Sequence, residues 1–386
     1  MTTSGIDSAL TDAVTTGTVS GVSAAAWSDR GQYLGAFGEA RAGVAMEPDT
    51  PVRIFSMTKA ITAAAVMQLV EQGRVDLDTP AGEFVPYLAG VQVLDGFGAD
   101  ETPRLRPPAR PVTLRALLTH TSGFGYDFAD ATLAQYVPTL GAAPANSQAS
   151  FEHPLTSDPG TRWSYGIGID WAGRVVEAIS GQGLEEYFQE HLLGPLGMGD
   201  TSFQPSAAHF ARLACLSLRT PDGLSPLPNE EPGDGEPYEM ASGGGGLYST
   251  VIDYLRFTRM ILEGGALDRT RVLAKATVEE MGRDHLGELS APGWTSTNPI
   301  FTEDVHLLPG QRATWGLSFM INTEATAEGR APGSLAWAGA ANSYYWIDPT
   351  RRVTGVFATQ ILPFHDPKVL GAFSAFERET YRALGN

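Results

Sequence analysis

The sequence predicts an α+β protein with a mainly antiparallel sheet and a largely helical middle third. Segments of strand composition gather near the start of the chain and again in its last third. Helical patterns between proline-containing loops fill the middle. Short turns join successive strands, which favours hairpins and antiparallel pairing. One sheet can then be assembled from both ends of the chain, with a ligand site expected between the sheet and the helices.

The composition supports this class. The 386 residues are 42% hydrophobic and only 18% charged, and 44 glycines with 26 prolines indicate a loop-rich globular protein with a substantial core. We therefore expect a single catalytic domain over 1–386. Its sheet lobe would comprise about 1–85 and 240–386, and its helical lobe about 86–239.

In the first third, turn residues separate short strands from helices. Gly73 can cap the end of the long apolar helix. The expected elements are a helix over 6–17, a hairpin of 22–27 with 33–38, a strand over 52–55, a helix over 60–70, and a short helix from Asp76 through Val85.

The middle third begins with a loop over 90–112 that is rich in proline, glycine and charge. Thr113 is a plausible N-cap for a short helix ending at 118. Residues 130–240 are expected to be mostly helical, with Gly181 separating helices over 171–180 and 183–193. The stretch 233–236 is polar and turn-rich.

The last third returns to strands. Thr250 or Ser249 caps an amphipathic helix that runs to Leu262. The remaining expected elements are strands over 315–321, 334–340, 343–348 and 353–360, and a closing helix over 368–384.

Charge and cysteine content exclude several functions. A net charge of −18 argues against nucleic acid or anionic membrane as a partner. The one cysteine, Cys215, excludes an intrachain disulfide and a cysteine-rich metal site. The seven histidines never form H-x-x-x-H, so we expect neither a metal nor an organic cofactor. The N-terminus lacks a basic and apolar signal pattern, and no apolar run is long enough to span a membrane, which indicates a cytoplasmic protein.

Ser56 and Lys59 form the most informative pattern, Ser56-Met57-Thr58-Lys59. The serine lies between a strand-like segment and an apolar helix, and helical spacing puts Lys59 on its face one turn later. A nucleophilic serine needs such an amine to accept its proton, and a helix N-terminus would favour the developing oxyanion. The following helix is apolar nearly all round, so Lys59 is expected to be buried. Without further motifs, Ser56 would equally well be a plain N-cap.

Two other patterns bear on the chemistry. No serine lies in G-x-S-x-G; the nearest match, Gly21 to Ala25, ends in alanine, so Lys59 is a better candidate base than a histidine. Tyr165 follows a proline-glycine turn and could relay a proton if a nearby cation such as Lys59 favours its phenolate. The run Gly243 to Gly246 lacks the lysine of a phosphate loop and indicates close backbone approach near a cleft.

Together these residues resemble the serine β-lactamase and penicillin-binding protein superfamily. The similarity is to its class C β-lactamase-like branch, which includes family VIII carboxylesterases, D-aminopeptidases and lovastatin-type acyltransferases. It covers nearly the whole chain and implies a β-lactamase-like two-lobe fold. The matching segments are Phe55 to Lys59 (S-x-x-K), Leu117 to Gly123 (L-L-x-H-T-S-G), Pro159 to Tyr165 (P-G-x-x-F/W-x-Y), Leu193 to Met198 with Thr201 (P-L-G-M-x-x-T) and Gly243 to Tyr248 (G-G-L-x-S/T).

The resemblance implies roles for these residues. Ser56 would be the acylated nucleophile, Lys59 would accept its proton or favour the Tyr165 phenolate, and Tyr165 would protonate the leaving group. The third box of the family falls at Trp337-Ala338-Gly339. Gly339 would leave room for substrate along an edge strand, and the N–H of Ala340 would form an oxyanion hole with that of Ser56.

Two departures point away from β-lactams. Trp337 stands where β-lactamases carry a lysine that helps to recognise a carboxylate, and it offers an apolar face instead. Ile167 replaces an asparagine that would contact a β-lactam side chain. Phe124 is also expected among the substrate-binding residues, and His120 is expected to be structural, bonded to backbone.

We therefore predict a serine hydrolase that cleaves a small-molecule carboxylic ester through an acyl-enzyme on Ser56. The alternatives are a β-lactamase or D-amino-acid peptidase, an acyltransferase, and a non-catalytic binding protein on the same fold. The natural substrate and the oligomeric state are left open, since the shapes of 90–155 and 285–312 cannot be derived from the sequence.

Overall fold

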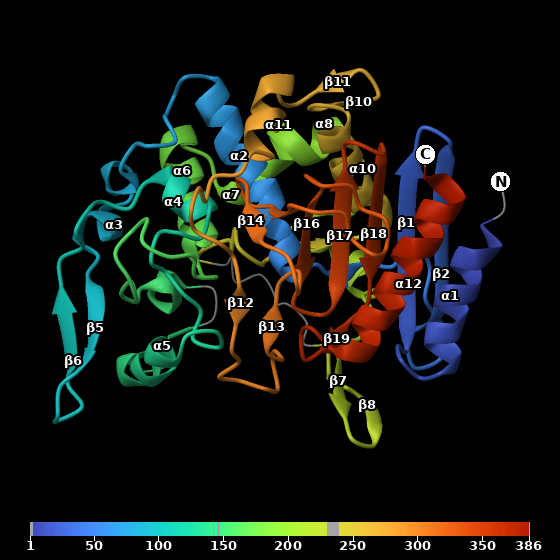
Figure 1. Cartoon of the computed structure of the whole chain (residues 1–386), viewed down its shortest axis with the longest axis horizontal. Helices are drawn as coiled ribbons and strands as arrows, with labels where there is room; N and C mark the ends of the chain where they lie inside the picture. Colours follow the sequence, from blue (N-terminus) through green and yellow to red (C-terminus); the bar gives the residue numbers. More distant parts are fainter. Residues whose placement is uncertain (1–2, 142, 145–146, 230–238, 386) are drawn as a thin grey trace.

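The centre of the molecule is an eight-stranded sheet made from both ends of the chain. The computed structural model describes residues 3–141, 143–144, 147–229 and 239–385. The strand order is β14-β15-β16-β17-β18-β1-β2-β3, and every neighbouring pair is antiparallel. This confirms the predicted α+β class, with N-terminal strands beside C-terminal ones (Figure 1).

The elements have the following bounds. The sheet contains β1 (Gly21–Ser28), β2 (Gly31–Arg41), β3 (Val44–Ala45), β14 (Ala313–Trp315), β15 (Met320–Asn322), β16 (Leu335–Gly339), β17 (Ser343–Asp348) and β18 (Val353–Ala358). Short pairs and one three-stranded sheet are made by β4 (Val52–Arg53), β5 (Val93–Phe97), β6 (Pro103–Arg106), β7 (Ser217–Thr220), β8 (Gly223–Pro226), β9 (Tyr248–Ser249), β10 (Ala266–Leu267), β11 (Thr270–Arg271), β12 (Gly293–Trp294), β13 (Val305–His306) and β19 (Ile361–Leu362). The α-helices are α1 (Ser4–Thr15), α2 (Thr58–Glu71), α3 (Pro86–Gly90), α4 (Leu114–Leu118), α5 (Ala131–Tyr136), α6 (Gly168–Ser180), α7 (Leu184–Phe188), α8 (Gly194–Leu196), α9 (Ala207–Phe210), α10 (Val251–Leu262), α11 (Lys275–Met281) and α12 (Pro367–Leu384). Shorter 3₁₀ or π segments are η1 (Phe55–Met57), η2 (Ala81–Glu83), η3 (Val137–Leu140), η4 (Gln148–Phe151) and η5 (Gln189–Leu193).

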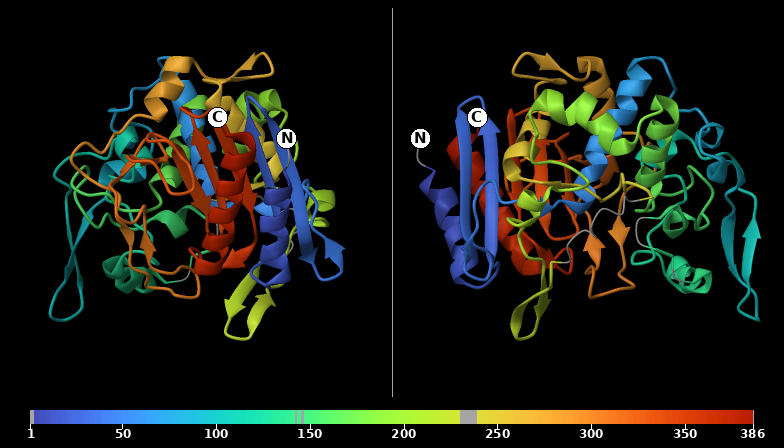
Figure 2. Two further views of the ribbon diagram at one scale, coloured as in Figure 1. Left: turned by 45° about the vertical axis from the view of Figure 1, so that its right-hand side comes forward. Right: turned by 180° about the vertical axis from the view of Figure 1, so that it is seen from behind.

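Helices cover both faces of the sheet. The terminal helices α1 and α12 lie side by side on one face, while α2 and α10 lie on the other (Figures 1 and 2). The alternation along β17 shows the two cores, since Trp346 packs against Phe373 and Phe376 of α12. Its neighbour Tyr345 packs on the opposite face, against Tyr254 of α10.

The helix that follows Ser56 is buried as predicted. Its residues from Thr58 through Leu69 are all buried, so α2 passes through the protein rather than along its surface. Two predicted caps are also present: the Thr113 hydroxyl accepts from the N–H of Ala116, and the Thr250 hydroxyl accepts from the N–H of Asp253. Gly181 ends α6 with a left-handed backbone conformation, at φ 79°.

Four sequence predictions of local structure were wrong. The short helix expected from Asp76 through Val85 is a turn followed by the 3₁₀ segment η2. The loop expected over 90–112 contains the hairpin β5–β6, and the expected helical region contains the hairpin β7–β8. The single strand expected over 315–321 is a tight hairpin, β14–β15, because Ser318 turns the chain at φ 75°. In each of these hairpins a short turn determines the local structure, whereas the prediction relied on overall composition. The predicted turn at 233–236 lies outside the described residues.

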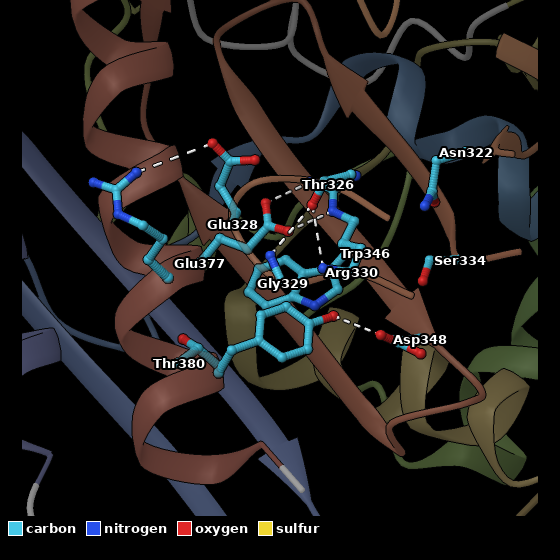
Figure 3. Close-up of polar contacts among 12 residues, drawn as sticks. Asn322, Thr326, Glu328, Gly329, Arg330, Ser334, Trp346, Asp348, Glu377 and Thr380 are labelled. Atoms are coloured by element: carbon cyan, nitrogen blue, oxygen red, sulfur yellow. Dashed lines mark hydrogen bonds and ion pairs between the residues drawn. The ribbon is translucent and has the colours of Figure 1, made fainter. Parts of the chain in front are cut away.

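A buried polar network attaches the loop after β15 to α12 (Figure 3). Arg330 donates two hydrogen bonds to the carboxylate of Glu377, at 2.6 and 2.7 Å, and both side chains are almost fully buried. Asp348 accepts from the N–H of Ala331 and from the hydroxyl of Tyr381, each at 2.9 Å. These contacts fix the loop after β15 and the end of β17 against α12.

No helix in the described part of the chain is both long and apolar enough to cross a membrane.

Candidate active site

Ser56 occupies a tight turn between β4 and α2. Phe55 has a left-handed backbone, at φ 44°, which is costly for a residue with a side chain. The chain then makes the η1 turn and enters α2 at Thr58. The strained residue immediately before Ser56 turns the chain into the helix and leaves the serine side chain facing a cavity. The predicted strand-to-helix junction is therefore present.

Lys59 is fully buried and its ammonium group has three hydrogen-bond acceptors. Its Nζ lies 3.0 Å from Ser56 Oγ, 3.0 Å from the hydroxyl of Tyr126 and 2.6 Å from the carbonyl oxygen of Gly244. An ammonium group carries three N–H donors, so each has a partner. The contact with Ser56 is the one that the sequence spacing predicted.

Tyr126 is a site residue that the sequence analysis missed. Its phenol accepts from Lys59, and its ring stacks on Phe128 at 4.7 Å between centroids. Burial raises the pKa of the Tyr126 phenol well above its usual range, with further contributions from Asp170 and Tyr165. Tyr126 therefore stays a neutral phenol that helps to hold Lys59. It lies in a loop with no motif spacing to Ser56, so only the structure reveals the contact.

The backbone of the glycine run is hydrogen-bonded to side chains of two helices, α6 and α2. Asp170 of α6 accepts from the N–H of Gly244 at 2.9 Å and from the Ser242 hydroxyl at 2.6 Å. A Cβ on Gly244 would lie 2.2 Å from an Asp170 oxygen, so no larger residue fits. Burial raises the pKa of Asp170, while Lys59 and the two hydrogen bonds oppose this rise. The predicted close backbone approach is observed, and it delivers the Gly244 carbonyl to Lys59.

Tyr165 lines the same cavity, with its hydroxyl bonded to tryptophan. Trp337 Nε1 donates to the Tyr165 hydroxyl at 3.2 Å. The Lys59 ammonium lies over the Tyr165 ring, 4.9 Å from its centroid. Trp294 also lines the cavity. Its ring is nearly parallel to that of Tyr165, with 5.0 Å between the ring centroids. Trp337 thus contributes a polar N–H as well as the expected apolar face.

The end of β16 forms one wall of the cavity. β15 pairs with β16 only at Leu335 and Ala336, so the ladder on this side stops before Trp337. β16 was expected at an edge of the sheet but is an internal strand. Its residues from Trp337 to Gly339 do not pair with β15. Gly339 is required for packing, because a Cβ there would lie 2.3 Å from the carbonyl oxygen of Ile54. The space that Gly339 leaves is therefore taken by the chain before Ser56, and Gly339 and Ala340 also line the cavity.

The cavity has a volume of about 240 Å³ and a lining rich in aromatic side chains. None of these described lining residues has a charged side chain. They are Phe55, Ser56, Tyr126, Phe128, Tyr165, Ser242, Gly244, Gly245, Gly246, Trp294, Phe301, Thr302, Trp337, Ala338, Gly339, Ala340 and Phe364. Trp294, Phe301 and Phe364 were missed by the sequence analysis, because Trp294 lies in the two-residue strand β12 and the other two lie in connecting segments, all without a periodic pattern. Their aromatic character outside the long helices and strands was the available signal.

Two predicted substrate-binding residues point elsewhere. Phe124 is buried between Trp171 and His153, with ring centroids at 6.3 and 5.8 Å, and does not line the cavity. Ile167, at the start of α6, is buried in the core and does not line it either. Each lies next to a motif, and its apolar side chain turns toward the protein interior.

His120 is a buried neighbour of the site. Its Nδ1 accepts from the backbone N–H of Gly166 at 3.4 Å, and its ring lies 4.8 Å from that of Tyr165. Burial, followed by the charge of Lys59, holds the pKa of His120 well below its usual range. This neutral, backbone-bonded imidazole agrees with the structural role expected from the sequence.

The described residues include no cluster of three or more histidine, cysteine, aspartate or glutamate side chains suited to a metal ion. The chemistry available at this site is that of a serine hydroxyl, an amine and two phenols.

Known proteins resemble this chain over most of its length. The beta-lactamase family profile matches residues 6–377. Lovastatin esterase from Penicillium rubens is 33% identical over 348 residues, covering 86% of each chain. Monacolin J acid methylbutanoyltransferase from Aspergillus terreus is 31% identical over 349 residues, covering 87% of this chain and 83% of the other.

Solved structures share the fold. A mutant of simvastatin synthase from Aspergillus terreus superimposes with a TM-score of 0.85 at 30% identity, covering 98% of this chain and 96% of the other. EstCE1, a hydrolase with promiscuous acyltransferase activity, has a TM-score of 0.77 at 20% identity and covers 98% of both chains. The antiparallel sheet, the buried helix after Ser56 and these matches together place the chain in the beta-lactamase family, among its esterase and acyltransferase members.

Proposed function

We propose that this protein is a serine esterase that forms an acyl-enzyme on Ser56. The observation that carries the proposal is the 3.0 Å contact between Ser56 Oγ and the buried Nζ of Lys59, at the wall of an aromatic cavity. For this step Lys59 first releases to solvent the proton that it directs at Ser56; the neutral amine keeps two N–H donors for Tyr126 and the Gly244 carbonyl, and its lone pair accepts the hydroxyl proton as Ser56 Oγ attacks the ester carbonyl. Tyr126 and the Gly244 carbonyl keep Nζ in place during the transfer.

The remaining steps use groups at the cavity wall. The N–H groups of Ser56 and Ala340 receive the developing oxyanion, as the family resemblance implies. The proton that Lys59 took from Ser56 passes to the alkoxide leaving group through the Tyr165 hydroxyl, which the Trp337 N–H orients, and Lys59 returns to the neutral amine. Water then attacks the acyl carbonyl, releases the acid and regenerates Ser56.

The proposed substrate is an uncharged, apolar ester. The cavity has aromatic walls, none of its described lining residues is an arginine or lysine that could bind a carboxylate, and Trp337 stands at the family's cationic position. Lovastatin esterase, a relative at 33% identity, is named for an ester substrate, which supports the same bond type here.

The decisive test compares the wild type with Ser56→Ala. We expect the wild type to hydrolyse p-nitrophenyl butyrate and the folded variant to lose this activity by at least about three orders of magnitude. A fluorophosphonate probe should label the wild type and leave the variant unlabelled. Retained turnover in Ser56→Ala would overturn the nucleophile, and absence of both turnover and labelling in the wild type would favour a non-catalytic protein. Faster turnover of nitrocefin than of the ester would favour a β-lactamase.

Acyl transfer to an alcohol is a second candidate. Monacolin J acid methylbutanoyltransferase is a relative at 31% identity, and an aromatic cavity can hold an alcohol in place of water. The test is to add an alcohol of increasing size to the ester assay and to separate ester from acid products. An ester product that exceeds the acid at millimolar alcohol would favour transfer; acid alone would favour hydrolysis.

A further inference from the structure

A row of five aromatic rings runs from the candidate active site to the opposite face of the sheet. Tyr165 stacks on Trp294, at 5.0 Å and 8°, and Trp294 stacks on Phe364, at 5.9 Å and 18°. Phe364 stacks on Tyr344, at 6.3 Å and 30°, and Tyr344 stacks on Phe373 of α12, at 4.6 Å and 18°. The first two residues line the catalytic cavity, and the last two line a different one.

The second cavity lies between the sheet and α12, with a volume of about 320 Å³. Its sheet side is formed by Ala336, Ala338 and Tyr344, which share the face of the sheet that α12 covers. The lining includes the apolar side chains of Leu307, Leu308, Met320, Leu370 and Phe373. The buried Arg330–Glu377 pair belongs to the lining as well and gives this cavity a polar wall. No step of the proposed mechanism uses this space.

Phe364 separates the two cavities. Its side chain lines both of them and is 8% exposed. The backbone holds it there, since its N–H donates to the Phe301 carbonyl at 2.8 Å and its carbonyl accepts from Glu303 at 2.9 Å. The β15–β16 ladder stops at Ala336, so β15 does not continue across this region, whereas β16 stays paired with β17 through Gly339. Trp337 and Ala338 line both cavities too, but they belong to the sheet, whereas Phe364 lies in a connecting segment.

We propose that Phe364 sets the maximum length of the hydrocarbon chain that the site accepts, by closing the catalytic cavity against the second one. In its absence the second cavity receives the apolar tail of a long-chain ester. The inference rests on the proposed esterase function and assigns the second cavity as an extension of the same site. Burying an additional methylene there contributes about 0.8 kcal/mol, or roughly a fourfold gain in kcat/KM for each one.

The experiment measures kcat/KM of the wild type and Phe364→Ala on two ester series. The first varies the acyl chain of p-nitrophenyl esters from acetate to myristate, and the second varies the alcohol chain of butyrate esters. In one of the series, we expect Phe364→Ala to move the optimum to longer chains and to raise long-chain kcat/KM at least about tenfold relative to the short ester. Phe364→Leu should give an intermediate shift and replaces the alanine variant if that one does not fold.

Two further variants distinguish this effect from a general enlargement of the catalytic cavity. Phe301→Ala removes a similar ring from the catalytic cavity without opening the second one, so it should not extend the chain-length optimum. Leu370→Trp refills the second cavity, and combined with Phe364→Ala it should abolish the long-chain gain. Unchanged optima in both series for the folded Phe364 variants would overturn the inference while the esterase function stands. A wild type that cleaves no ester would instead overturn the function itself.

Discussion

At the scale of single residues, the candidate site depends on contacts to Lys59 that no motif specifies. Two of its three acceptors, Tyr126 and the Gly244 carbonyl, come from segments far from Ser56 in the sequence. A buried ammonium group is tolerated only when its donors are satisfied. These partners therefore determine where Nζ lies relative to the serine.

Replacing Tyr126 by phenylalanine tests this dependence. The variant keeps the ring stacked on Phe128 but removes the hydroxyl that accepts from Lys59. We expect kcat/KM for a p-nitrophenyl ester to fall about tenfold, the effect of losing roughly one hydrogen bond to a charged group. Tyr136→Phe, at a buried tyrosine of α5 outside the cavity, is the matched control. Equal rates for both variants would show that the contact is dispensable.

Gly339 offers a test of backbone packing beside Ser56. In Gly339→Ala the new methyl would meet the Ile54 carbonyl at 2.3 Å, so β16 or the turn before Ser56 must move. We expect a loss of about 1–3 kcal/mol in unfolding free energy together with reduced kcat. Gly371→Ala, on α12 with no atom within 4 Å of the added carbon, should instead stabilise the protein by up to about 1 kcal/mol. Denaturant unfolding measures both; similar stabilities would contradict the close packing.

At the scale of elements, buried charges join segments that would otherwise be held by apolar packing alone. The Arg330–Glu377 pair attaches the loop after β15 to α12 (Figure 3). Glu377→Gln leaves Arg330 buried without its counter-charge and should destabilise the protein by about 3–5 kcal/mol.

The exposed pair Lys275–Glu279 on α11 is the control for that substitution. Its side chains are 77% and 62% exposed, and Lys275→Met should change the stability by no more than about 0.5 kcal/mol. Equilibrium unfolding in urea checks both variants. If the two substitutions lower the free energy of unfolding equally, the buried pair does not contribute the stability that its geometry indicates.

Asp253 makes the attachment of α10 sensitive to pH. Its carboxylate accepts from the Asp200 N–H at 2.8 Å and from the Thr201 hydroxyl at 2.9 Å. Burial raises the pKa of Asp253 to about 6, against the opposing effect of these hydrogen bonds. As pH rises from about 4 to 6 the unfolded chain releases this proton first, so the free energy of unfolding falls.

The pH effect is measured by comparison with Asp253→Asn, which cannot ionise. The stability of the wild type relative to the variant should decline as pH rises from 4 to 7, by up to about 3 kcal/mol, and then level off. Urea unfolding at several pH values gives this difference directly. A difference that is independent of pH would show that the carboxyl group does not keep its proton on folding.

At the scale of the whole molecule, the sequence predicted the sheet better than the walls of the cavity. The strands at both ends, the buried helix after Ser56 and the contact with Lys59 follow from local periodicity and spacing. Phe124 and Ile167 were misplaced because an apolar residue beside a motif can turn either way. The division into a sheet lobe and a helical lobe stays a prediction.

The cavity walls were missed for a physical reason. Tyr126 and Phe364 reach the site from loops, and Trp294 from the two-residue strand β12; the course of all three segments depends on long-range packing. No pattern of residue spacing in the sequence predicts which of these side chains will reach the cavity. The two hairpins β5–β6 and β7–β8 were missed similarly, since short turns there override the composition around them.

The pairing of β1 with β18 also governs how the chain can fold. Ala25 lies opposite Val356, so the centre of the sheet joins residues from opposite ends of the sequence. Closing so long a loop carries a large entropic cost and slows folding. During synthesis, the β1–β2 hairpin emerges early and keeps one edge unpaired until β18 has left the ribosome. This edge is open to intermolecular pairing throughout that interval, which exposes β1 to aggregation before the sheet closes.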